Sequence, residues 1–146
     1  MAASPELFTS PLKILFMKIG QNIKDHTFIP RLAICIVLLS HGVPGMLNGG
    51  VNAFGNLFLN QIGFSPLGVY LAWAIKISHV VCAILFLFNK YVRASAILTI
   101  SILIMGIILV HWQEGWFVVG GGRNGIEYNV ILIFILIYLM FPKGFK

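Results

Sequence analysis

Four long apolar runs constrain the fold of this chain more than any other feature of its sequence. A transmembrane helix needs about 20 apolar residues, because the hydrocarbon core is about 30 Å thick and each helical residue rises 1.5 Å. The runs are apolar in every register, whereas a lipid-facing β-strand alternates apolar and polar residues over about 10 positions. We therefore predict an all-α fold, a four-transmembrane-helix bundle, with spans at about residues 30–47, 65–88, 92–111 and 127–141.

The composition agrees with a membrane protein. Hydrophobic residues make up 59% of the sequence and charged residues 10%, and the mean hydropathy is +0.96. These values lie outside the range of soluble domains. Four crossings and short connections fill the chain, so we expect a single membrane domain over residues 1–146 with the lipid bilayer as its surroundings.

The positions of the basic residues predict the orientation, because cytoplasmic loops are enriched in Lys and Arg. Arg123 lies on one side of the predicted bundle, and Lys76 lies inside a span. All other basic residues fall on the opposite side: Lys13, Lys18, Lys24, Arg31, Lys90, Arg93, Lys143 and Lys146. We therefore expect a multi-pass protein of the cytoplasmic (inner) membrane with both termini in the cytoplasm. The net charge of +6 then reflects topology and anionic lipid, and not nucleic-acid binding.

A further helix is predicted before the first span, over residues 11–24. Ser10 is a suitable N-cap with Pro11 at the first helical position. Apolar residues then recur at helical spacing: Leu12, Leu15, Phe16, Ile19 and Ile23. This pattern favours an amphipathic helix lying in the membrane interface. A signal peptide is the alternative, but the segment has no small-residue cleavage site and ends in the polar stretch 21–27.

Three ionisable residues fall near the middle of their predicted spans: His41, Lys76 and His79. Such residues are costly in lipid, so they face the bundle interior or a wet cavity and are candidates for function. Lys76 and His79 are three positions apart, which places them on one face of a helix. In the alternative interpretation, Lys76 snorkels and His79 hydrogen-bonds a backbone carbonyl.

The residues after His41 predict a cavity beside it. Pro44 removes a backbone donor and clashes with the carbonyl of Ser40, so the helix should kink or end just beyond His41. Carbonyl groups freed at this depth must be satisfied by protein or water. The alternative is a packing kink closed by Gly42 and Gly45.

A second polar group is expected at the outer side, formed by His111, Glu114, Arg123 and Glu127. An aromatic belt accounts for the nearby tryptophans, and the helix dipole accounts for a carboxylate at the start of the last span. We expect His111 and Glu127 to form a charge-assisted hydrogen bond, either as a clasp on the glycine-rich loop or as an entry for protons or ligand. Cys35 and Cys82 lack the spacing of a metal or redox motif, and no metal site is predicted.

The order of motifs resembles the DoxX family over about residues 28–142. It runs from Arg31-Leu32-Ala33 through His41-Gly42, Val92-Arg93-Ala94, His111-Trp112 and Gly115-Trp116-Phe117 to Gly125-Ile126-Glu127-Tyr128-Asn129. The resemblance implies a four-helix bundle in the cytoplasmic membrane and an association with redox systems. The family is similar to the small membrane subunits of thiosulfate:quinone oxidoreductases.

Two departures from the family pattern concern the candidate site. Members often carry a Glu about fourteen residues before the arginine matched to Arg93, and His79 stands at that position. The Lys that often follows the His-Gly pair has no counterpart, since Met46 and Leu47 occupy that region. Lys76 could replace the lost positive charge from the next helix, which would rebuild a Glu and Lys site from His and Lys.

Three functions follow from these observations. The first is a redox-associated subunit of a larger membrane complex that binds a quinone head group between His41, Lys76 and His79. Ligation of haem by the two histidines is a subsidiary case. The second is a non-catalytic partner or scaffold subunit, and the third is a small transporter or proton conductor. The chain lacks a nucleotide motif, so a complete enzyme is not expected, and other subunits or further copies are the expected protein partners.

Overall fold

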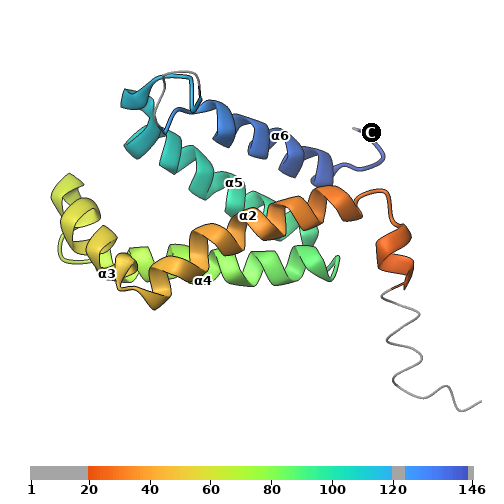
Figure 1. Ribbon diagram of the computed structural model, residues 1–146, viewed down its shortest axis with the longest axis horizontal. Helices are drawn as coiled ribbons and strands as arrows, with labels where there is room; N and C mark the ends of the chain where they lie inside the picture. The colour runs from red at the N-terminus through yellow and green to blue at the C-terminus, as the bar shows by residue number, and fades with distance from the viewer. Residues whose placement is uncertain (1–19, 120–123, 145–146) are drawn as a thin grey trace, which may run out of the picture.

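The computed structural model describes residues 20–119 and 124–144, and this part of the chain is all-α without strands (Figure 1). The long helices are α2 (Phe28–Leu47), α4 (Gly68–Leu87), α5 (Val92–Gly106) and α6 (Glu127–Met140). A short helix α3 (Gly50–Phe54) and a π-helical segment η1 (Gly55–Phe64) lie between α2 and α4. Helix α5 continues as a π-helical turn η2 (Ile107–His111) and a 3-10 turn η3 (Trp112–Glu114).

Three helical segments are long and apolar enough to cross a membrane: Phe28–Leu47, Gly68–Leu87 and Val92–Glu114. Helix α6 is equally apolar but shorter, with 14 residues. Large apolar side chains such as Ile36, Ile77 and Phe134 are exposed on the outer faces, where lipid can cover them. The protein is therefore a multi-pass membrane protein, and the predicted all-α fold is confirmed.

The helices form two antiparallel pairs (Figure 1). Helix α2 packs along α4, and α5 packs along α6; the pairs meet through α4 with α5 and through α2 with α6 (Figure 1). Their shared core lies in the half of the bundle that holds the α4–α5 connection, and Cys35 and Cys82 are buried in it as free cysteines. The largest fully buried apolar side chains of this core are Phe86, Ile34 and Leu136.

The first two spans begin within three residues of their predicted positions. The first span was expected from about residue 30 and the second from residue 65, and α2 begins at Phe28 and α4 begins at Gly68. Arg31 was expected to flank the membrane, yet it lies inside α2 and its side chain is only 1% exposed. The predicted interfacial helix 11–24 lies mostly outside the described residues; its last part, residues 20–24, is helical.

Asp25 organises the turn before α2. Its Oδ1 atom accepts hydrogen bonds from the hydroxyl and the backbone N–H of Thr27, both at 2.7 Å. These two bonds stabilise the carboxylate and hold the pKa of Asp25 below its usual value. The other carboxylate oxygen accepts from the side chain of Asn89 at 3.2 Å, which ties the turn to the connection between α4 and α5.

The segment between α2 and α4 is helical and packs against the bundle. It packs as α3 and η1 against the start of α4, where the Trp73 indole N–H donates to the side chain of Asn52 at 2.8 Å. The side chain of Asn60 accepts a hydrogen bond from the backbone of Gly68 at 2.9 Å. Gly55 allows the closest approach, because a Cβ atom there would lie 2.5 Å from the Cα atom of Val69. Within η1 the helical backbone is interrupted at Gly63, which has a positive φ of 111°.

Candidate functional site

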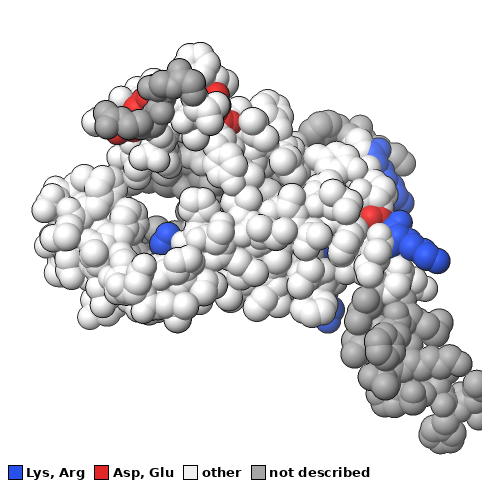
Figure 2. Space-filling model, viewed as in Figure 1, with Lys and Arg blue, Asp and Glu red and all other residues white. Residues whose placement is uncertain are grey.

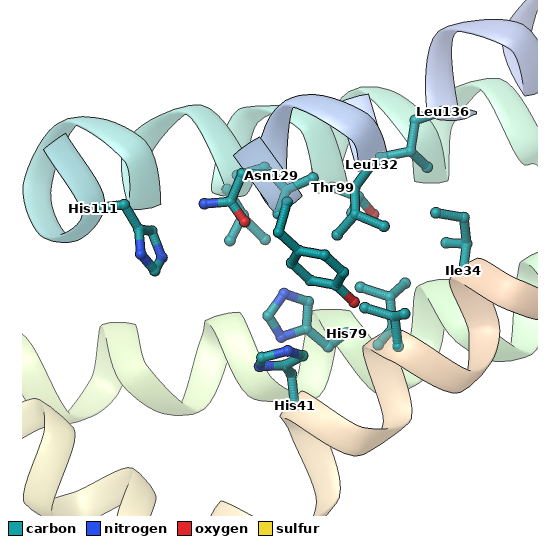
Figure 3. A pocket seen from close by; sticks show the side chains of 13 residues that line it. Ile34, His41, His79, Thr99, His111, Asn129, Leu132 and Leu136 are labelled. Carbon is teal, nitrogen blue, oxygen red and sulfur yellow. The ribbon is translucent and has the colours of Figure 1, made fainter. Parts of the chain in front are cut away.

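A cavity of about 150 Å³ lies between the two helix pairs, and we call it the histidine cavity (Figure 3). Three histidines from different segments line it: His41 of α2, His79 of α4 and His111 of η2. Its other lining residues are Ile34, Val37, Leu38, Thr99, Ile102, Leu103, Tyr128, Asn129, Leu132 and Leu136. The cavity is therefore an apolar chamber with a few polar groups directed into it, which is the usual character of a small-molecule site.

His79 is the most buried of the three histidines. The residue is only 8% exposed, and its Nδ1 atom has no hydrogen-bond partner within the described part of the chain. A buried polar atom without a partner costs about 1–3 kcal/mol. This cost is recovered if a molecule in the histidine cavity offers a hydrogen-bonding group to His79.

A cavity lies beside His41, and of the two outcomes predicted for the helix beyond it, a kink or an end, the structure excludes the end. His41 lines this cavity, as the Pro44 argument predicted. The helix does not end beyond His41, since α2 continues through Pro44 to Leu47. Gly42 allows α2 to pack closely against α4 on the turn before the proline, because a Cβ atom there would lie 3.3 Å from the Val80 side chain.

His111 was predicted to belong to the outer polar group, and the structure places its ring in the wall of the histidine cavity as well (Figure 3). Its Nδ1 atom lies within hydrogen-bonding distance of the backbone oxygen of Asn124. His111 therefore connects the cavity to the loop before α6. Residues 20–119 and 124–144 hold no group of three His, Cys, Asp or Glu side chains close enough to bind one metal ion.

Thr99 and Asn129 are polar lining residues that the sequence analysis did not select. Both are buried, and the Thr99 hydroxyl donates to the backbone oxygen of Ser95 at 2.8 Å. Asn129 stands in the first turn of α6, where its amide faces the cavity (Figure 3). Its place in the Glu127-Tyr128-Asn129 motif was the only available signal, because a lone Thr or Asn in a span is not unusual in sequence.

Lys76 does not line the histidine cavity, although it was expected to share a site with His41 and His79. Its Nζ atom donates to the backbone oxygen of His41 at 2.9 Å and lies 6.0 Å from the ring centroid of Phe54. The ammonium therefore points toward the side of α2 that faces α3. A three-residue spacing places two side chains on one helix face but leaves room for them to lean toward different neighbours.

The outer polar group is only partly assembled. The Glu127 side chain accepts a hydrogen bond from the backbone N–H of Val118 at 2.8 Å. A hydrogen bond or ion pair between His111 and Glu127 is absent from the described residues, because Glu127 binds the returning loop instead. Glu114 is exposed in η3, and Arg123 lies outside the described residues. Glu127 thus acts as a clasp on the loop before α6.

Comparison with known protein families adds one finding. The DoxX family model matches residues 26–112, which is more than half of the 146-residue chain. The matched region contains all three histidines of the cavity and ends before α6. No curated protein and no solved structure matches the chain.

Proposed function

Since the chain belongs to the DoxX family, we propose that it is a membrane subunit that binds the ring of a quinone in the histidine cavity. The resemblance to quinone-linked redox systems suggests the ligand class, and the cavity supports it. The observation that carries the proposal is the buried Nδ1 atom of His79, which has no hydrogen-bond partner among the described residues.

The size of the cavity favours one six-membered ring. Apolar protein cavities of roughly 150 Å³ hold a single benzene ring, and the histidine cavity has about the same volume. Larger ligands occupy pockets of roughly 300–1,000 Å³, so a haem group does not fit. Aliphatic side chains such as Leu38, Leu132 and Leu136 can contact the ring faces, while His79 and Asn129 can hydrogen-bond to its carbonyl oxygens.

The chemistry of the lining residues agrees with this role. A bound quinone supplies the redox chemistry, which the side chains of this chain do not provide. His111 connects the cavity to the loop before α6 through its contact with Asn124. The apolar wall excludes bulk water from the ring. The electrons come from another subunit, so the protein acts within a larger membrane complex.

A binding experiment with a short-tailed quinone tests the proposal. We expect quinone to quench the tryptophan fluorescence of the purified protein with saturation. His79→Leu should weaken binding about tenfold, because a hydrogen bond to a buried polar group is lost. His26→Leu is the matched control, since His26 is exposed beside Asp25 and does not line the cavity. Equal affinity of the protein and His79→Leu for quinone would refute the proposed site.

We also propose that α6 is the fourth span and that both termini are cytoplasmic. The 14 residues of α6 extend about 21 Å, which is shorter than the hydrocarbon core of about 30 Å. Local thinning of the bilayer or the flanking residues can accommodate such a mismatch at small cost. The basic residues at the α4–α5 connection and after α6 support this orientation.

Reporter fusions test this topology. A reporter that works only in the cytoplasm should be active when it is placed after Lys143 or between Lys90 and Arg93. A reporter that works only outside the cytoplasm should be active when it is placed between residues 48 and 64 or between residues 118 and 124. A reporter after Lys143 that reads as external would show that α6 does not cross the membrane in the proposed way.

A further inference from the structure

Lys76 carries a charge that the quinone proposal does not use. Its ammonium has three N–H donors, and one of them binds the backbone oxygen of His41. Within the described part of the chain, no carboxylate lies within ion-pair distance of Lys76. The ion pair that the described residues do contain joins His26 and Asp25. Basic groups at membrane depth are normally paired, so the positive charge of Lys76 is available to an anion.

The Phe54 ring, 6.0 Å from the Lys76 ammonium, lines an apolar slot of about 270 Å³. On one side, α3 and η1 contribute Phe54, Phe58, Leu59 and Phe64, and on the other side α5 and η2 contribute residues between 101 and 110. Its floor is formed by Leu71 and Ile75 of α4. The only side chain in this lining with a hydroxyl or charged group is Ser101, whose hydroxyl already donates to the backbone oxygen of Ile97. The slot therefore suits an aliphatic chain and not a polar head group.

Phe54 and Ile75 connect the charge to the slot. The ring of Phe54 lines the slot and lies beneath the ammonium of Lys76, and Ile75 precedes the lysine in α4. Figure 2 shows a hollow between the lobe formed by α3 and η1 and the rest of the molecule, with a basic side chain in it. Lys76 is the one Lys or Arg between residues 32 and 89 of the sequence. The other basic groups in this view lie at the opposite end of the molecule (Figure 2).

We propose that this second site binds the carboxylate of a long-chain fatty acid, with the head group on Lys76 and the chain in the slot. The apolar lining provides the area that an acyl chain buries, and the ammonium provides the counter-charge. The α5 side of the slot spans residues 101–110, a length of about 13 Å along the helix. The site is separate from the histidine cavity, and the inference does not depend on quinone binding.

The position of Lys76 selects a fatty acid over a phospholipid. Lys76 lies eight residues from the start of α4, which is about 12 Å along the helix. A phosphate group of a bilayer phospholipid stays at the interface, above this depth. A free carboxylate with a single chain can enter sideways between η1 and α5 and neutralise the lysine.

Spin-labelled lipids in phosphatidylcholine nanodiscs test this proposal at a pH where the carboxylate is ionised. Electron paramagnetic resonance should show that the protein immobilises labelled stearate about tenfold more strongly than labelled methyl stearate, as expected for a charge-assisted hydrogen bond. Lys76→Met should abolish this preference, and Lys76→Arg should retain it. Labelled phosphatidylglycerol should show no such preference over labelled phosphatidylcholine.

A slot variant keeps the test valid if Lys76→Met fails to fold. Ser101→Phe places a large side chain in the slot from an exposed position and should reduce stearate immobilisation about tenfold. Ile104→Phe, on the same helix but outside the slot, is the control and should leave it unchanged. Equal immobilisation of stearate and its methyl ester would overturn the proposal. A preference for stearate that survives both Lys76→Met and Ser101→Phe would also overturn it, as would equally strong retention of phosphatidylglycerol.

Discussion

Replacing Arg31 with methionine is expected to lower the free energy of unfolding by roughly 3 kcal/mol or more. The guanidinium donates to the backbone oxygen of Phe86 at 2.9 Å and to the side chains of Thr27 and Asn22 at 3.0 and 2.6 Å. The Phe86 carbonyl lies at the end of α4, where carbonyl groups have no partner within the helix. Methionine resembles the aliphatic part of the arginine side chain but supplies no donor, so the acceptors on Phe86, Thr27 and Asn22 each lose a hydrogen bond.

Thermal and denaturant unfolding of the protein in detergent, followed by circular dichroism, would measure this loss. Arg93→Met is the matched control, because Arg93 also donates to a helix-end carbonyl, that of Met140 at 3.1 Å, but from an exposed position. Its loss should cost less than about 1 kcal/mol. Equal effects of the two substitutions would show that Arg31 is not the tie between α2 and α4 that we describe.

The second large effect is expected for Gly55→Val. Even the Cβ atom of a new side chain would lie 2.5 Å from the Cα atom of Val69 and 2.8 Å from its backbone nitrogen, so the backbones of η1 and α4 must separate. Overpacking of this kind costs about 1–3 kcal/mol. We also expect the α3 and η1 segment to leave α4, which breaks the Trp73 to Asn52 hydrogen bond and opens the apolar slot.

Limited proteolysis would detect this release as faster cleavage between residues 48 and 64, and labelled stearate would lose its immobilisation. Gly20→Val is the control, because no atom lies within 4 Å of its added Cβ atom and Gly20 does not line the slot. If Gly55→Val resists proteolysis as well as the unmodified protein does, the close contact between η1 and α4 is not what holds the segment.

The spans could be predicted from sequence because hydropathy over about 20 residues reports directly on lipid contact. Helix α2, for example, begins within two residues of its predicted start and ends at the predicted residue. The packing of residues 48–64 on α4 could not be predicted. It depends on the contact of Gly55 with Val69 and on the amide of Asn60, and neither leaves a periodic signal in the chain.

Only part of the candidate site could be predicted from the sequence, because the rest depends on contacts in space. Depth in the membrane identified His41 and His79 as residues that avoid lipid, and both line one cavity. Depth could not show that Lys76 turns toward Phe54, because the direction of a long side chain depends on its neighbours in space. His111 was assigned to the outer loop because it ends a span, whereas the π-helical turn η2 carries its ring into the cavity.

The most direct test of the histidine cavity is an absorption spectrum and a lipid extract of the protein purified gently from its membrane. We predict that the extract contains quinone in a near-equimolar amount and that the spectrum shows no haem bands. His79→Leu, purified in the same way and shown to be folded, should have lost most of this quinone. Haem bands in the protein, an extract free of quinone, or an equal amount of quinone in His79→Leu would contradict the assignment of the histidine cavity as a quinone site.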